Sequence, residues 1–307
     1  MAKKLVGIII VAALIVTSRQ ADAHPGSGIV VDPQGNVLFQ DSAARTIWKV
    51  DPQGKVTSYY DKMGGHWMAL DEEGKFARSK LKLIERITPD GFTPALIVAD
   101  GGAPIAVNTD GCLYYGLSFS DTDKAIVGIT KISPDGKQDK FAPELGKAVE
   151  ALGVTGLTAG PDGTLYAACL TNIVKVKPDG TFTTLVESVD VKDCDRDLPN
   201  CFLRGLGVDS RGTVYAAACG CRCVVKISPN RKVETVLKAE RPWSPTGIAV
   251  RSDDVYVLEY TNANGHLSEG WLPRVRKIGR DGSVTTLATI SDEQQKAQPN
   301  RQVLQPR

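Results

Sequence analysis

The sequence predicts an all-β protein, a six-bladed β-propeller with four antiparallel strands in each blade. The first observation is a pattern that recurs six times: an aliphatic residue, a spacer, a basic residue, an aliphatic residue and a turn rich in Pro, Asp and Gly. Its basic residues are Lys49, Arg86, Lys131, Lys175, Lys226 and Lys277. A repeat of roughly 40 to 50 residues is the spacing expected of propeller blades.

The second observation is a hairpin pattern upstream of each basic residue. An aliphatic strand, a turn with Gly and another apolar strand follow one another, most clearly at residues 28–39, 155–168 and 204–217. Short runs of Val, Ile, Leu and Tyr between such turns predict antiparallel strands. One such unit cannot bury both of its faces alone, so six units are expected to stack around an axis.

A fourth strand follows each basic residue and completes the blade. These outer strands are expected at residues 55–60, 92–98, 138–143, 182–187, 232–237 and 283–288. The density of Gly and Pro at the turns excludes a helical repeat protein of similar period.

The units resemble NHL repeats from about Gly28 to Ile290, with the second unit the most degenerate. The resemblance implies the propeller fold, which hosts enzymes and binding modules alike. Among propellers that are distantly similar, regucalcin and the gluconolactonases hold a divalent cation with carboxylate and Asn oxygens. The amidating lyases hold zinc with three histidines.

The chain is expected to have three parts. Residues 1–23 have the layout of a signal peptide: Lys3 and Lys4, an apolar stretch, and a small-residue cleavage site at Ala21 to Ala23. Residues 24–290 form the propeller, and the polar tail 291–307 is expected to be disordered. We therefore expect a periplasmic or secreted protein. The apolar stretch is too short for a transmembrane helix, so no membrane span is expected after cleavage.

Charge is balanced. The leader contains three of the 37 basic and one of the 35 acidic residues, so the mature chain carries no net charge. A chain without net charge is not attracted to nucleic acid or to an anionic membrane surface, so neither is expected as a partner. We expect a monomer whose partners are a small molecule, a peptide or a protein.

Seven cysteines in an exported chain should mostly be paired. Cys194 and Cys201 flank a loop that a disulfide could close. Cys169 and Cys219 occupy similar places in adjacent blades and are a second candidate pair. Cys112 is expected to be a buried thiol.

Long, irregular loops all fall at one end of the predicted propeller, and long loops on a rigid scaffold are where sites usually lie. The inner strands open there at Ser27, His66, Ala103, Thr155, Arg204 and Thr246. The predicted ligand-binding residues are His66, Arg204, Glu259, Tyr260, Trp67 and Trp271. Packing between blades is the commoner use of such tryptophans.

A metal-dependent lyase or hydrolase is the alternative to a binding propeller. Its calcium or zinc ion would be held by candidates among His24, His66, His266 and Glu259. Surface or loop positions are the alternative interpretation of the histidines. None of the six positions that open the inner strands is acidic, so the carboxylate pattern of the calcium-binding propellers is absent there.

Overall fold

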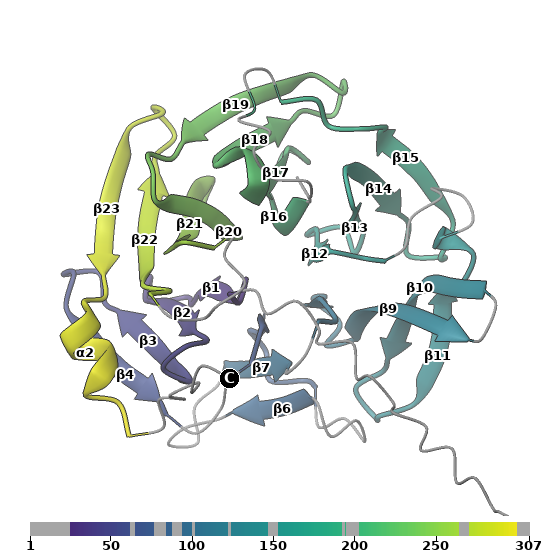
Figure 1. Ribbon diagram of the computed structural model, residues 1–307. Helices are drawn as coiled ribbons and strands as arrows, with labels where there is room; N and C mark the ends of the chain where they lie inside the picture. Colours follow the sequence, from purple (N-terminus) through teal and green to yellow (C-terminus); the bar gives the residue numbers. More distant parts are fainter. Residues whose placement is uncertain are drawn as a thin grey trace, which may run out of the picture.

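The computed structural model describes residues 25–61, 65–76, 84–87, 94–99, 102–121, 124–146, 153–191, 194, 203–263 and 270–299. These residues form six antiparallel sheets arranged around a central axis, which confirms the six-bladed propeller (Figure 1). Five sheets have four strands, and the second blade has three strands among the described residues.

The inner strands of neighbouring blades contact one another around the whole ring, and β1 meets β20 to close it. The inner strands are β1 (Ile29–Val31), β5 (Trp67–Asp71), β8 (Ile105–Val107), β12 (Gly156–Ala159), β16 (Leu203–Val208) and β20 (Trp243–Arg251). The second strands are β2 (Val37–Asp41), β9 (Leu113–Asp121), β13 (Leu165–Cys169), β17 (Val214–Ala218) and β21 (Asp254–Thr261). The third strands are β3 (Thr46–Val50), β10 (Lys124–Ile132), β14 (Asn172–Val176), β18 (Cys223–Ile227) and β22 (Pro273–Ile278). The outer strands are β4 (Val56–Tyr60), β11 (Gln138–Ala142), β15 (Phe182–Val186), β19 (Val233–Lys238) and β23 (Val284–Thr289).

Burial is greatest in the second strands and least in the outer strands. Every residue of β2, β13 and β17 is buried, because a second strand is covered on both faces by neighbouring blades. Both β13 and β17 are continuous apolar runs, whereas β2 ends in Gln40 and Asp41. In the outer strands β4 and β23, Ala288 is buried and the other residues are intermediate or exposed, and both strands carry Thr.

The short turns between inner and second strands are closed by local hydrogen bonds. Asp32 accepts bonds from the backbone N and the Nδ2 of Asn36, at 2.8 and 2.7 Å. Gly35 supplies the left-handed conformation of this turn, with φ 83°. The Asp-and-Gly turns that the sequence predicts are therefore tight and self-contained.

Blade two departs from the pattern. Its strands run in the order β5, β7 (Ala95–Ala99) and β6 (Ile84–Ile87), so β7 lies directly beside the inner strand. The prediction that residues 92–98 form the outer strand is wrong in this respect. All five residues of β7 are apolar and buried, as in the second strands of other blades.

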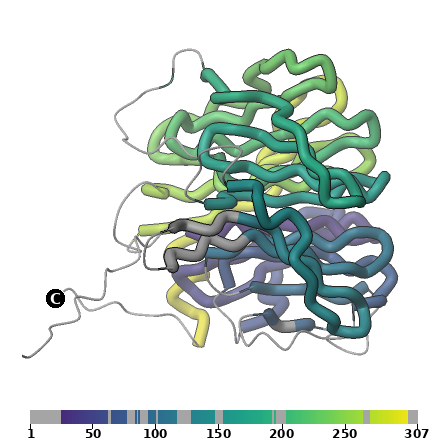
Figure 2. The backbone as a smooth tube through the Cα atoms, turned by 90° about the vertical axis from the view of Figure 1, so that its right-hand side faces the viewer, coloured from purple at the N-terminus to yellow at the C-terminus, as the bar shows by residue number. Residues whose placement is uncertain are grey.

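Each blade is built from one continuous stretch of chain, so blades one and six meet without exchanging a strand. Figure 2 shows the purple N-terminal segment beside the yellow C-terminal one. The Tyr260 hydroxyl donates to the Gln40 carbonyl across this junction.

The C-terminal helix α2 (Asp292–Lys296) adds a second link at the same junction (Figure 1). Ser291 and Gln294 form a capping box at its start, and the side chain of Gln295 is buried against Asp41. The prediction of disorder is therefore wrong for residues 292–296. The capping box at Ser291 and the buried amide of Gln295 stabilise this short polar helix. In the described part of the chain, no helix is long and apolar enough to cross a membrane.

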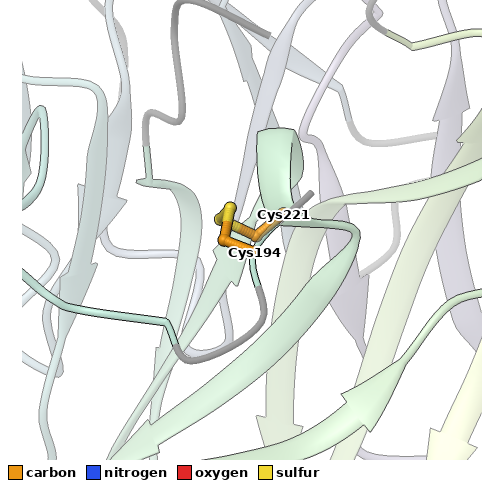
Figure 3. Close-up of a disulfide and its surroundings, with 2 residues drawn as sticks. All are labelled: Cys194 and Cys221. Atoms are coloured by element: carbon orange, nitrogen blue, oxygen red, sulfur yellow. A yellow bond between two sulfur atoms is a disulfide. The ribbon is translucent and has the colours of Figure 1, made fainter. Parts of the chain in front are cut away.

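The disulfide joins Cys194 to Cys221, with a Cα–Cα distance of 4.7 Å (Figure 3). It links the connection between blades four and five to a 3-10 turn, η2 (Cys219–Cys221). The predicted partner of Cys194 is therefore wrong, and Cys201 lies outside the described residues. Cys169 and Cys219 are buried and form no disulfide with each other, so that prediction is wrong as well.

Candidate ligand site at the entry end of the central channel

A narrow cavity of about 190 Å³ runs along the propeller axis. All six inner strands line it, mostly with aliphatic side chains and backbone. We call the end where the inner strands begin the entry end, and the end with the short turns the turn end. Ser27 and Trp67 line the cavity at the entry end, whereas Glu72 and Arg251 line it at the turn end.

Charge is neutralised at the turn end. Nη1 of Arg251 lies 2.6 Å from Oε1 of Glu72, which bridges blades six and two across the cavity. The same nitrogen donates to the carbonyl of Val31 at 3.4 Å. The opposite charges cancel, so this end offers no net charge to a ligand.

The segment before β1 crosses the entry end. The backbone N of Ser27 donates to the His66 carbonyl at 2.7 Å, and the Thr246 hydroxyl donates to the Gly26 carbonyl at 2.9 Å. Nη1 of Arg204 donates to the Pro25 carbonyl at 3.3 Å. Pro25, Gly26 and Ser27 are therefore hydrogen-bonded to blades five, six and two, respectively.

Buried polar atoms without hydrogen-bond partners collect at this end. They are the hydroxyl of Ser27, the indole Nε1 of Trp67, and both amide atoms of Gln40. Gln40 is completely buried, and Ser27 and Trp67 are 5% and 6% exposed. Buried polar groups normally have partners, so a cluster of exceptions requires an explanation.

Glycines make room around the Gln40 amide. A Cβ on Gly28 would lie 2.8 Å from its Oε1, and a Cβ on Gly65 would lie 3.0 Å from its Nε2. Larger residues at these two positions would collide with the amide. The glycines thus bring backbone from blades one and two against a polar side chain that follows three apolar residues in β2.

A β-bulge presents Arg204 at this end. The ladder between β16 and β17 shifts register between Leu203 and Leu206, and the ladder of blade six shifts between Pro245 and Gly247. Bulges are common beside functional sites because they redirect a side chain. In the described part of the chain, no Asp or Glu lies within ion-pair distance of Arg204, and the Pro25 carbonyl is its one hydrogen-bond acceptor.

Of the predicted ligand-binding residues, the structure brings together His66, Trp67 and Arg204. Glu259 is a blade-six residue whose carboxylate is completely buried between Arg274 and Arg276, at 2.7 and 2.5 Å. Its charge is therefore committed to structural ion pairs.

Tyr260 and Trp271 lie in the core at the junction of blades one and six. Burial raises the pKa of Tyr260 well above its ordinary value, so its hydroxyl stays protonated and donates to the Gln40 carbonyl. Trp271 is 3% exposed, and its Nε1 donates to the Asn262 carbonyl at 3.2 Å. Both side chains are occupied by packing and hydrogen bonds.

The predicted metal ligands His24 and His266 lie outside the described residues. In the described ranges, the structure gathers no group of three or more His, Cys, Asp or Glu side chains that could hold a metal ion. The entry end offers an indole N–H, a hydroxyl, an amide, a guanidinium and the imidazole of His66. Protein sites for divalent cations combine several carboxylate, imidazole, thiolate or carbonyl donors, and one imidazole with one amide oxygen does not make such a set.

Asp41, at the end of β2, is a buried carboxylate close to this region. Burial raises its pKa to about 6, although bonds from Ala44, Trp48 and Gln295 act in the opposite direction. Gln40, its neighbour, is the residue that sequence reasoning missed. A glutamine directly after the apolar run 37–39 was the available signal.

No protein-family model and no curated protein matches the sequence. Solved structures do match the fold. A putative gluconolactonase is 14% identical with a TM-score of 0.55, and the match covers 87% of this chain and 92% of that one. A gluconolactonase from Xanthomonas campestris is 16% identical with a TM-score of 0.53, over 77% and 83% of the two chains.

The calcium-binding protein regucalcin from Agrobacterium tumefaciens is 15% identical with a TM-score of 0.52. That match covers 79% of this chain and 84% of regucalcin. Identities this low carry no assignment of activity. The chain shares the β-propeller fold of these proteins.

Proposed function

We propose that this protein is an exported propeller that binds a small polar molecule at the entry end of its channel. The observation that carries the proposal is the cluster of buried, unsatisfied polar atoms on Ser27, Gln40 and Trp67. A buried polar group without a partner costs about 1–3 kcal/mol, so a ligand that satisfies several of them gains much of its affinity there.

The donors and acceptors are complementary to a polar ligand. Ser27 can donate and accept, Trp67 can donate, and the Gln40 amide can do both. Ser27 and Trp67 line the cavity itself, and Gln40 lies behind Gly28 as a polar wall. The remaining walls at this end are aliphatic side chains and strand backbone. Small-molecule sites usually combine apolar walls with a few placed polar groups.

The leader-like residues 1–23 and the Cys194–Cys221 disulfide support an oxidising compartment, either periplasmic or secreted. The NHL character of the repeats and the monomeric state belong to the same proposal. Native mass spectrometry of the exported protein tests the mature start at His24, the oligomeric state and the disulfides together.

The test of binding is a ligand screen by native mass spectrometry on the purified mature protein. Pools of small polar metabolites are added to the wild type and to the double variant Ser27→Ala/Gln40→Met. We expect an adduct on the wild type that is lost in the variant. The control is Ser210→Ala, because Ser210 bonds to Asp253 at the turn end and should leave the adduct intact.

A wild-type protein that takes up no member of the pools would contradict the proposal, because its unsatisfied groups would then hold internal water only. Equal adducts on the wild type and the double variant would also contradict it, because the ligand would be bound elsewhere.

A metal-dependent lactonase or lyase is the second candidate, and the shared fold with gluconolactonases and regucalcin supports it. Among the described residues at the entry end, His66 is the one predicted metal ligand, so such a site would have to combine it with further ligands such as His24 or His266. Metal analysis of the wild type and of His66→Ala, with lactone hydrolysis as the assay, tests this candidate. A stoichiometric metal that is lost in the variant would favour it.

A further inference from the structure

We infer that the ligand at the entry end carries a carboxylate and that Arg204 is the residue that binds it. This inference rests on the proposed function and narrows it to small monoanions. It starts from a difference in charge between the two ends of the cavity.

At the turn end, Arg251 is neutralised by Glu72 at 2.6 Å. Elsewhere in blade six, Arg274 and Arg276 are neutralised by Glu259 and Glu240. Arg204 is also partly buried, yet no carboxylate of the described residues neutralises it. A partly buried charge has lost some of its hydration, so an anion from outside that supplies the missing partner would be bound favourably here.

The bonding capacity of Arg204 agrees with this assignment. A guanidinium has five N–H donors in a planar fork, and one nitrogen of Arg204 bonds to the Pro25 carbonyl. The remaining donors can bind a carboxylate in the bidentate geometry that Arg favours. Donors on Ser27 and Trp67 lie at the same end, so a ligand rich in acceptor oxygens is complementary to all three residues.

The amount of charge selects a carboxylate over a phosphate. A phosphate monoester carries a charge of about −1.5 to −2 at neutral pH, whereas a carboxylate carries one charge. The charged residues that line the cavity are Glu72 and Arg251, which cancel each other. One unneutralised cation, Arg204, lies at the entry end beside a cavity of about 190 Å³, and it matches one small monoanion.

The experiment compares carboxylates with uncharged analogues of the same shape. Propionate and propionamide, lactate and lactamide, and benzoate and benzamide are titrated into the mature wild type, each up to about 10 mM, ten times a millimolar Kd. Thermal unfolding and calorimetry measure binding. We expect a carboxylate to bind, its amide partner to bind at least about tenfold more weakly, and Arg204→Gln to remove this preference.

Two further variants separate charge, geometry and folding. Arg204→Lys keeps the charge without the fork, so it should bind the carboxylate with intermediate affinity. Arg211→Gln removes an arginine of the same blade at the turn end, where its side chain is 70% exposed, and should bind as the wild type does. Circular dichroism verifies that each variant is folded.

The inference is overturned if no carboxylate binds the wild type, or if Arg204→Gln binds carboxylates as well as the wild type does. An amide that binds the wild type as tightly as its carboxylate also overturns it. If that amide binding is lost in Ser27→Ala/Gln40→Met, the proposed function survives without the carboxylate. If nothing polar binds in either experiment, both fail.

Discussion

Polar groups at the two ends of the propeller are satisfied in different ways. At the turn end, Asp32 and Asp209 accept bonds from their own turns, and Arg251 is paired with Glu72. At the entry end, Ser27 and Gln40 have buried polar atoms without partners. Short turns satisfy their own polar groups locally, whereas the entry end brings together groups from separate blades. The difference indicates that the turn end contributes to stability and the entry end to binding.

The strongest test of this division is at the turn end. Asp209 is 1% exposed and accepts from the backbone N of Arg211 and Thr213, at 2.9 and 2.8 Å. Asp209→Ala should lower the free energy of unfolding by roughly 3–5 kcal/mol. Two backbone N–H groups of the turn and the Arg211 guanidinium then lose their acceptor. Urea denaturation measures the loss, and ligand affinity should not change.

The control for Asp209 is its exposed partner. Arg211→Gln should cost less than about 1 kcal/mol, since most of that side chain is in solvent. If Asp209→Ala were no worse than Arg211→Gln, the turn end would not have the stabilising role assigned to it.

The next effect concerns pH and the buried Asp41. Its folded pKa of about 6 lies above the ordinary value of 3.8, so the folded state holds this proton more tightly than the unfolded state does. The resulting stabilisation, about 3 kcal/mol, is fully present below pH 3.8 and is lost as the pH rises through about 6. Urea denaturation between these pH values should show this fall.

Asp41→Asn should remove that part of the pH dependence because an amide does not titrate. A slope that is unchanged in the variant would assign the titration to another group. The comparison uses slopes rather than absolute stability, since an amide also alters the bonds from Trp48 and Gln295.

A smaller effect of opposite sign is expected at the entry end. Gln40→Met keeps the length of the side chain and removes two buried, unsatisfied polar atoms, so it should raise the free energy of unfolding by about 1–2 kcal/mol. The same change should weaken ligand binding. A variant that is less stable than the wild type in the absence of ligand would show that the Gln40 amide already has a partner.

The smallest effect on stability is expected for Ser27→Ala. The hydroxyl has no partner to lose, so the free energy of unfolding should stay within about 0.5 kcal/mol of the wild type while the affinity for ligand falls. Denaturation and calorimetry on the same sample measure the two quantities. A parallel loss of stability and affinity would contradict the division between the two ends.

Much of this architecture was predictable because every blade repeats the same local sequence pattern. Alternating strands and Asp-Gly turns predicted six blades, and the alignment of inner strands placed Arg204 and His66 at one end. The partner of Cys194 was not predictable, because η2 brings Cys221 close only in the folded chain. The apolar run at 95–99 already resembled a second strand more than an outer one, and burial decides its place.

The sequence by itself determined the propeller, the balanced charge and the loop-rich end, because each depends on periodicity and composition within a blade. The tertiary structure decided which polar groups are satisfied, since that depends on contacts between blades. Glu259 meets Arg274 and Arg276, and Gln40 meets glycine backbone from two blades. The groups that surround such a side chain are distant in sequence. Whether it finds a hydrogen-bond partner is therefore decided only when the blades pack together and the ring closes.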